Sequence, residues 1–146
     1  MKKIYAIRGV QKTGKSESIK MFYNKLKAKY TNLEISDKYT PIYDGDISVV
    51  VEINGKIIAI ESQGDPNSRI LDSLPKFAAI PANIIICATR TRGSTVDVVK
   101  QQQENYQITW IDKKESTNVD KGNKEKNREA NNKVADDLML RLEGDL

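Results

Sequence analysis

The fold of this chain follows from one short segment, Gly9-Val10-Gln11-Lys12-Thr13-Gly14-Lys15-Ser16, which reads G-x-x-x-x-G-K-S. Before it, residues 3–8 form a short apolar run that favours a β-strand. After it, apolar residues recur with helical spacing at Ile19, Phe22, Tyr23, Leu26 and Tyr30. The segment is therefore predicted to join a strand to the N-terminus of an amphipathic helix, which is the context in which this pattern binds phosphate.

The two glycines of this segment explain why it suits an anion. Gly9 and Gly14 allow the backbone to curl through conformations that other residues resist, so that successive N–H groups point inward as a nest for phosphate oxygens. The helix that follows adds unpaired N–H groups and the positive end of its dipole. We expect every residue from Gly9 to Ser16 to take part, with Lys15 reaching the β- and γ-phosphates, Ser16 binding Mg²⁺ and Lys12 adding charge at the rim.

The composition narrows the class of protein. A length of 146 residues predicts one domain with a modest core. The net charge is only +4 and the basic excess belongs to solvated faces, so we do not expect nucleic acid binding. The absence of histidine excludes histidine-based acid–base catalysis and most zinc sites. The lone Cys87 offers no disulfide framework and no apolar run reaches the length of a membrane span, so we expect a cytoplasmic protein without a membrane partner.

A β-hairpin is predicted after the first helix. Residues 31–44 are polar and indicate a crossing loop with a short strand near 33–35. Residues 46–53 and 56–61 are β-prone runs on either side of Asn54-Gly55. That pair suits a type I′ turn, because both residues adopt positive φ readily.

Two helices and two strands are predicted in the next part of the chain. Asp65 and Pro66 are typical of the N-cap and first position of a helix, so we expect a helix to begin there. Pro75 is expected to kink or divide this helix, and Pro81 to end it. The remaining elements are a buried strand over 83–89, a short helix over 94–104 and a last strand over 106–112.

This order of elements predicts a three-layer α/β fold, with helices on both faces of a mostly parallel sheet that contains one antiparallel hairpin. We expect a nucleotide-binding domain over residues 1–112 and a polar linker over 113–126. Residues 127–146 carry the apolar stripe of a C-terminal amphipathic helix. This helix either docks on the domain or meets a partner chain.

An acid near the Mg²⁺ ion is the next requirement of such a site. Glu61 is the candidate, because it is expected at the end of a strand beside the strand that precedes the phosphate loop. There it would hold a metal-bound water or orient the attacking water; the alternative is a carboxylate that faces solvent. Gly64 would bring a backbone N–H to the γ-phosphate. Asp65 would align or deprotonate a nucleophile, unless it serves only as an N-cap.

Two arginines are candidates for charge stabilisation. Arg90 and Arg92 follow the strand predicted over 83–89 and precede a capped helix. Their guanidinium groups would stabilise a transferring phosphoryl group or bind the phosphate of a second substrate; the alternative is plain exposure to solvent. Thr40, just before Pro41, is a further candidate ligand of Mg²⁺.

The segment from Gly9 to Ser16 resembles the Walker A motif of the P-loop NTPase superfamily. The hairpin that ends in Glu61-Ser62-Gln63-Gly64 is similar to the hairpin and D-x-x-G of Ras-like small GTPases, with glutamate in place of aspartate. That resemblance implies that Thr40 contacts Mg²⁺ and that the segments around Thr40 and Gly64 sense the γ-phosphate. The chain contains no guanine-reading N-K-x-D, so we expect adenine as the base or a pocket that accepts several bases. The chain also resembles short bacterial and phage ATP-binding proteins to which no reaction is assigned.

The sequence therefore predicts a small Mg²⁺-dependent NTPase that binds ATP or another nucleoside triphosphate and hydrolyses it slowly. Two alternatives remain open at this point. The first alternative is a small-molecule or nucleotide kinase, a class that shares the Walker A loop. Such kinases use arginines from a lid, and Arg90 and Arg92 would take that role here. A non-catalytic, nucleotide-switched interaction module would bind a protein partner through residues 66–80 or the C-terminal helix.

Overall fold

The computed structural model describes residues 2–10, 13–113 and 124–146, and it shows an α/β fold. Gln11, Lys12 and most of the predicted linker, residues 114–123, lie outside this description. The elements are β1 (Lys2–Arg8), α1 (Lys15–Lys29), β2 (Glu34–Ile35), β3 (Ile42–Tyr43), β4 (Ile47–Ile53), β5 (Lys56–Glu61), α2 (Ile70–Ala79), β6 (Ile84–Thr89), α3 (Ser94–Lys100), β7 (Tyr106–Asp112) and α4 (Lys124–Asp145).

The strands form one mixed sheet in the order β2-β4-β5-β6-β1-β7, with β3 also paired to β4. Strands β5, β6, β1 and β7 run parallel to one another. Strand β4 runs antiparallel to β5, β2 and β3. The prediction of a mostly parallel sheet with one antiparallel hairpin is therefore correct only in part, because the antiparallel pairing extends beyond the hairpin to two short strands.

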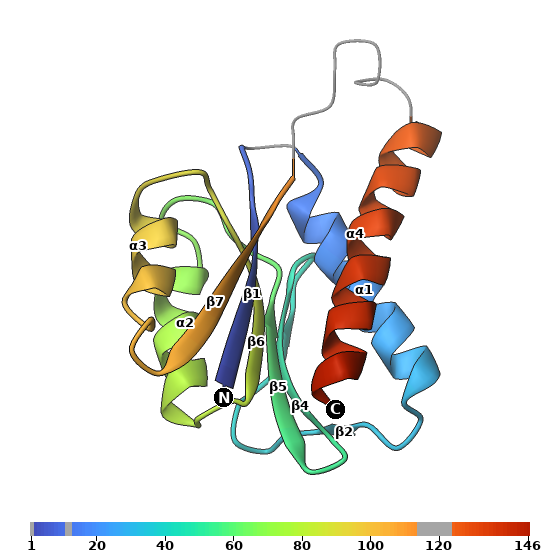
Figure 1. Cartoon of the computed structure of the whole chain (residues 1–146), viewed down its shortest axis with the longest axis vertical. Helices are drawn as coiled ribbons and strands as arrows, with labels where there is room; N and C mark the ends of the chain where they lie inside the picture. The colour runs from blue at the N-terminus through green and yellow to red at the C-terminus, as the bar shows by residue number, and fades with distance from the viewer. Residues whose placement is uncertain (1, 11–12, 114–123) are drawn as a thin grey trace.

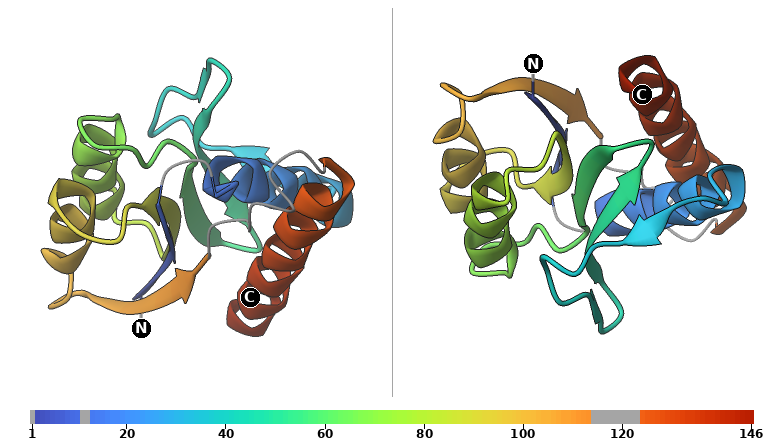
Figure 2. Two further views of the ribbon diagram at one scale, coloured as in Figure 1. Left: turned by 90° about the horizontal axis from the view of Figure 1, so that it is seen from above. Right: turned by 90° about the horizontal axis from the view of Figure 1, so that it is seen from below.

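Helices cover both faces of the sheet, as Figures 1 and 2 show. Helices α1 and α4 lie on one face, and α2 and α3 lie on the other. Along β5, Ile58 and Ile60 join the core beneath α1 and α4, whereas Ala59 joins the core beneath α2 and α3. This alternation follows from the two-residue period of a strand. The same alternation determines toward which face of the sheet each polar side chain at the end of β5 points.

The hairpin prediction is confirmed. Strands β4 and β5 pair in antiparallel register from Ser48 opposite Glu61 to Ile53 opposite Lys56. Asn54 and Gly55 connect them with φ of 53° and 79°, which are the positive values that a type I′ turn requires. The short strand predicted near residues 33–35 is also present, as β2.

Two helix boundaries differ from the prediction. Helix α2 begins at Ile70 rather than at Asp65, because the Ser68 N–H donates to the Asp65 carbonyl in a separate turn. Pro75 lies inside one helix and does not divide it, since Ile70, Leu74 and Phe77 are all buried against the sheet. This packing outweighs the single backbone hydrogen bond that a proline removes. Helix α3 ends at Lys100 rather than near residue 104.

The C-terminal helix α4 docks on the domain. Its buried residues Ala135, Leu138, Met139 and Leu142 share one core cluster with buried residues of α1. The helix begins at Lys124, so residues 124–126 of the predicted linker are helical. Among the described residues, no helix combines the length and the apolar character that a bilayer span requires.

Candidate functional site

The segment after β1 bends at the carboxyl ends of the parallel strands. The Gly9 N–H donates to the Thr89 carbonyl at the end of β6 over 3.1 Å. Gly14 has φ of 85° and ψ of 19°, a left-handed conformation that glycine adopts at little cost, and α1 starts at Lys15. The free N–H groups of α1 and the positive end of its dipole therefore face the edge of the sheet where ligands of open α/β folds bind.

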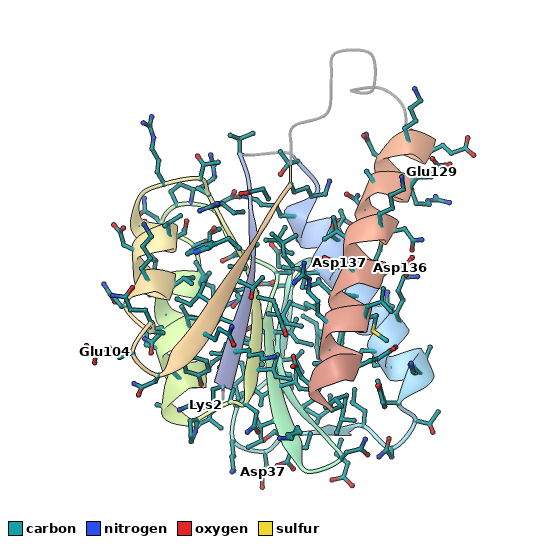
Figure 3. All side chains as sticks on the ribbon, in the orientation of Figure 1. Lys2, Asp37, Glu104, Glu129, Asp136 and Asp137 are labelled. Carbon is teal, nitrogen blue, oxygen red and sulfur yellow. The ribbon has the colours of Figure 1, made fainter. Side chains whose placement is uncertain are left out.

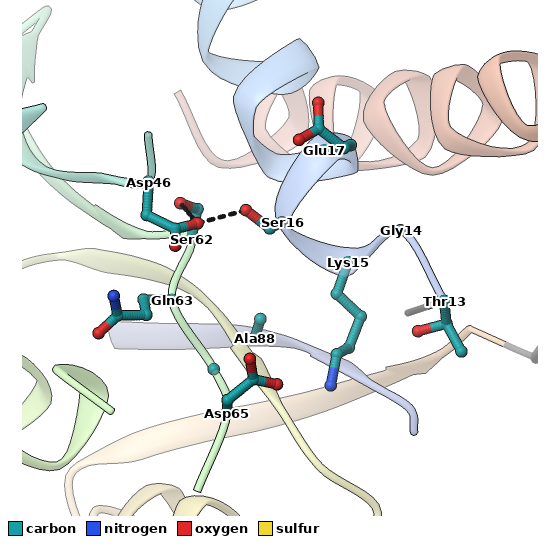
Figure 4. Close-up of a pocket in the computed structure, with 11 residues that line it drawn as sticks. Thr13, Gly14, Lys15, Ser16, Glu17, Asp46, Ser62, Gln63, Asp65 and Ala88 are labelled. Carbon is teal, nitrogen blue, oxygen red and sulfur yellow. Dashed lines mark hydrogen bonds between the residues drawn. The ribbon is translucent and has the colours of Figure 1, made fainter. Parts of the chain in front are cut away.

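A hollow of about 220 Å³ opens at this point. Its volume is below the roughly 300–1,000 Å³ of pockets that enclose a whole ligand, so it suits a chain of phosphate groups better than a complete nucleotide. Figure 4 shows the side chains around it. The lining residues are Thr13, Gly14, Lys15, Ser16, Glu17, Asp46, Ser62, Gln63, Gly64, Asp65 and Ala88.

Lys15 is buried beside the loop and is held by backbone oxygens. Its Nζ donates to the Gly9 carbonyl over 2.6 Å and to the Thr89 carbonyl over 2.8 Å. Burial lowers the pKa of Lys15 to about 8, although the nearby Asp65 carboxylate opposes this and Arg90 adds to it. The ammonium group is therefore poorly solvated where it lies. It would gain from an anion that took the place of the two carbonyl groups.

Ser16 and Asp46 form the polar centre of the hollow. The Ser16 hydroxyl donates to Asp46 Oδ1, and the Ser62 hydroxyl donates to the same oxygen over 2.8 Å. Burial alone would raise the pKa of Asp46, but these hydrogen bonds and the charge of Lys20 together lower it. Asp46 is therefore a carboxylate that remains charged next to the first turn of α1.

Sequence reasoning missed Asp46, although a signal for it was present. The predicted hairpin places the start of its first strand beside the end of its second, and the register confirms this by pairing Ser48 with Glu61. Any acid before β4 must therefore lie at the same edge of the sheet as Glu61. Asp46 is that acid, one position before the strand begins at Ile47.

The expected placement of Glu61 is wrong in two respects. Strand β5 does not lie beside β1, because β6 lies between them. The Glu61 side chain is fully buried, and Arg69 donates to it from Nε to Oε1 over 3.0 Å and from Nη2 to Oε2 over 3.1 Å. Glu61 shares the face of Ala59, under α2, whereas α1 lies on the opposite face. It is not among the described residues that line the hollow.

Gly64 and Asp65 both line the hollow. A Cβ atom on Gly64 would lie 2.2 Å from the Ala88 carbonyl oxygen, so only glycine allows this close approach to the end of β6. Asp65 is exposed and does not cap α2. Its Oδ1 lies 3.4 Å from Arg90 Nε, and its carboxylate faces the side of Lys15.

The other predicted residues lie further from the centre of the hollow. Arg90 reaches the rim through its ion pair with Asp65. Arg92 is exposed in the turn before α3, and Thr40 is exposed between β2 and β3. Neither Arg92 nor Thr40 is among the described residues that line the hollow. The structure therefore brings together Lys15, Ser16, Gly64 and Asp65, with Arg90 at their edge.

The residues of the hollow could hold a magnesium ion together with phosphate oxygens. The described part of the chain contains no group of three or more His, Cys, Asp or Glu side chains that could hold a metal ion by themselves. Mg²⁺ in phosphate sites commonly takes only one or two protein oxygens, together with phosphate oxygens and water. The Ser16 hydroxyl and the Asp46 carboxylate, already joined by a hydrogen bond, provide two such oxygens.

No protein-family model, no curated protein sequence and no solved structure matches this chain. A functional assignment therefore depends on the geometry and chemistry of its own residues.

Proposed function

We propose that this chain is a small P-loop NTPase-like domain that binds a nucleoside triphosphate, preferentially ATP, with Mg²⁺ and hydrolyses it slowly. One observation carries the proposal: Lys15 and Ser16 open α1 beside a hollow that also receives the Asp46 carboxylate and the Gly64 backbone. A helix N-terminus, a buried lysine, a hydroxyl group and a carboxylate are the groups that a magnesium–triphosphate complex requires. The missing N-K-x-D motif argues against guanine specificity, which favours adenine or a pocket that accepts several bases.

Each group has a defined task in this proposal. The N–H groups at the start of α1 bind phosphate oxygens. Lys15 leaves the Gly9 and Thr89 carbonyls and pairs with the β- and γ-phosphates. Ser16 and Asp46 hold Mg²⁺, which supplies positive charge that neutralises the phosphates. Gly64 lines the hollow, and its N–H would bind the γ-phosphate.

The proposed hydrolysis is slow because few groups are left to activate water. The Glu61 carboxylate is committed to Arg69. Asp65 is an exposed carboxylate at the hollow, and it would orient the attacking water from its position beside Lys15. Arg90 would place positive charge at the rim, where charge develops on the transferring phosphoryl group.

Calorimetry with MgATP tests the proposal directly. The Lys15→Ala variant is expected to lose measurable MgATP binding, while circular dichroism shows an unchanged fold. Lys27→Ala is the matched control, because Lys27 is an exposed lysine on the same helix whose Nζ lies over the Tyr23 ring. Equal affinities of Lys15→Ala and the wild-type protein would refute nucleotide binding at this loop.

A kinase is the second candidate function, and the Asp65–Arg90 pair favours it. A carboxylate able to accept a proton lies next to a guanidinium at the rim of the hollow, which is the arrangement that an acceptor hydroxyl and its phosphate would need. Incubation with MgATP and a panel of small-molecule and nucleotide acceptors, followed by mass spectrometry, separates the two. A phosphorylated acceptor supports the kinase, whereas release of phosphate alone supports hydrolysis.

A nucleotide-switched interaction module is the third candidate, and the burial of Glu61 favours it. A site without an activated water would hold its nucleotide for long periods. The partner surface would lie on residues 66–80 or on α4. Tight binding without turnover, together with complexes that form only with one nucleotide state, would identify this function.

A further inference from the structure

Both glycines of the phosphate loop are contacted by residues from the C-terminal part of the chain. A Cβ atom on Gly9 would lie 2.5 Å from the carbonyl oxygen of Lys113, which follows β7. A Cβ atom on Gly14 would lie 2.3 Å from Oδ1 of Asn131, which belongs to α4. The loop is therefore packed between the end of β7 and the C-terminal helix. The chemistry of phosphate binding does not require either contact.

Asn131 is the more informative of these neighbours. Its side chain is buried, with 8% of its surface exposed, and it lies against the Cα of Gly14. Its Oδ1 also lies 3.3 Å from Oγ of Ser18, whose hydroxyl donates to the Gly14 carbonyl over 2.8 Å. Asn131 thus touches the left-handed residue whose conformation aims the N–H groups at the start of α1.

The position of Asn131 in α4 divides that helix into two parts. From Asn131 to the C-terminus, α4 is anchored to α1 by Ala135, Leu138, Met139 and Leu142. Residues 124–130 are exposed except for the partly buried Asn127. Glu129 projects away from the protein in Figure 3. Asn131 is therefore the first buried residue of α4, at the point where the projecting turns reach the phosphate loop.

We propose that Asn131 is a positioning residue for the phosphate loop, so that nucleotide binding and the docking of α4 are thermodynamically linked. The inference rests on the proposed function. A nucleotide that fixes Gly14 also fixes the surface against which Asn131 packs, and a docked α4 favours the same loop conformation. Linkage is reciprocal, so each event strengthens the other by the same factor.

Hydrogen–deuterium exchange on the wild-type protein with and without MgATP tests this link without any substitution. Exchange in residues 124–138 is expected to slow more than exchange in α2, which lies on the opposite face of the sheet. Because nucleotide binding protects the whole fold from global unfolding, α2 provides the baseline. Slowing confined to the loop and α1, with α4 no more protected than α2, would overturn the inference.

Two adjacent asparagines provide a matched pair of variants. Asn131→Ala is expected to raise the dissociation constant for MgATP by about fivefold or more, and to abolish the additional protection of residues 124–138. Asn132→Ala is the control, because Asn132 is exposed and bonds only weakly to Asp136, over 3.4 Å. A purely structural Asn131 would lower the melting temperature while leaving the dissociation constant at the control value, and that result would also overturn the inference.

The wild-type calorimetry separates this inference from the proposed function. Absence of binding to MgATP, MgGTP and deoxynucleoside triphosphates would remove the proposed function, and the inference with it. Binding that is unchanged in Asn131→Ala, without additional protection of α4, would remove the inference and leave the proposed function standing.

Discussion

Two carboxylates lie at the same end of the β4–β5 hairpin but serve opposite faces of the sheet. On the α1 face, Asp46 accepts hydrogen bonds from Ser16 and Ser62 inside the hollow. On the α2 face, Glu61 is fully buried and ion-paired with Arg69. Arg69 Nη1 also lies 2.9 Å from Asp44 Oδ2, so Glu61, Arg69 and Asp44 form one charged cluster.

The difference shows how environment assigns different roles to similar side chains. A buried charge needs a partner, and a carboxylate without one would be destabilising by several kcal/mol. Arg69 provides that partner for Glu61 and thereby leaves its carboxylate with little capacity for a ligand. Asp46 accepts hydrogen bonds from the neutral hydroxyl groups of Ser16 and Ser62. These hydrogen bonds do not neutralise its negative charge, so we expect the carboxylate to be able to bind a cation. We expect the α2 face to control stability and the α1 face to control binding.

The largest expected effect is on the α2 face. Arg69→Ala should lower the free energy of unfolding by about 3–5 kcal/mol, because it leaves the buried Glu61 carboxylate without its cationic partner. Urea unfolding followed by circular dichroism measures this change. Arg141→Ala is the control, since its pair with Asp137 is an exposed i,i+4 pair and should contribute less than about 0.5 kcal/mol. If Arg69→Ala lowered the free energy of unfolding no more than Arg141→Ala does, the Glu61–Arg69 pair would not control stability.

An intermediate effect is expected on the α1 face. Asp46→Asn keeps an oxygen that can accept from Ser16 but removes the charge, so MgATP affinity should fall by roughly 10- to 100-fold, the range for a charged hydrogen-bonding group. Calorimetry measures the affinity. Asp44→Asn is the control, because Asp44 is a nearby acid that bonds Arg69 instead of Ser16. Equal losses in both variants would mean that the two faces do not have separate roles.

The smallest expected effect is a pH dependence of MgATP binding. It tests whether Lys15 binds the phosphates in its charged form. Its pKa is about 8 in the free protein, and bound phosphates would keep it charged, so the affinity for MgATP should fall above pH 8. Between pH 7 and pH 9 the charged fraction drops by about tenfold, and the affinity should fall by the same factor. Calorimetry across this range measures the change, and Lys15→Ala should lack this dependence.

The same lysine predicts a trend in stability with the opposite sign. Its pKa is lowered on folding, from 10.5 to about 8. Between these values the unfolded chain binds more protons than the folded one, so the free energy of unfolding gains a contribution as the pH rises through this window. Comparing wild-type protein with Lys15→Ala by urea unfolding at pH 7.5 and pH 10 isolates this contribution. A difference between the two proteins that does not change with pH would contradict it.

The parts of the fold predicted correctly are those specified by neighbouring residues. The Asn54-Gly55 turn and its flanking strands depend on local backbone preferences. The apolar stripe of the last helix depends on helical spacing within one segment. The predicted start of α2 at Asp65 failed because Asp65 and Pro66 suit a turn as well as a helix start. Burial of Ile70 and Leu74 decided where the helix formed.

The parts of the site that could not be predicted depend on contacts between distant segments. The strand order places β6 between β5 and β1, and no local pattern specifies that order. The alternation along β5 could have placed Glu61 on the face of Ala59, but the identity of that face depended on where the helices packed. The contact between Asn131 and Gly14 joins a helix near the C-terminus to a loop near the N-terminus.

By itself, the sequence determined that a glycine-hinged loop would connect a strand to the first turn of a helix, with a lysine and a serine at that turn. It could do so because turn and helix preferences act over a few residues. Only the tertiary structure decided that Asp46 rather than Glu61 lies opposite the serine, and that the last helix packs against the loop. Those choices follow from strand order and helix packing, which bring together residues far apart in the chain.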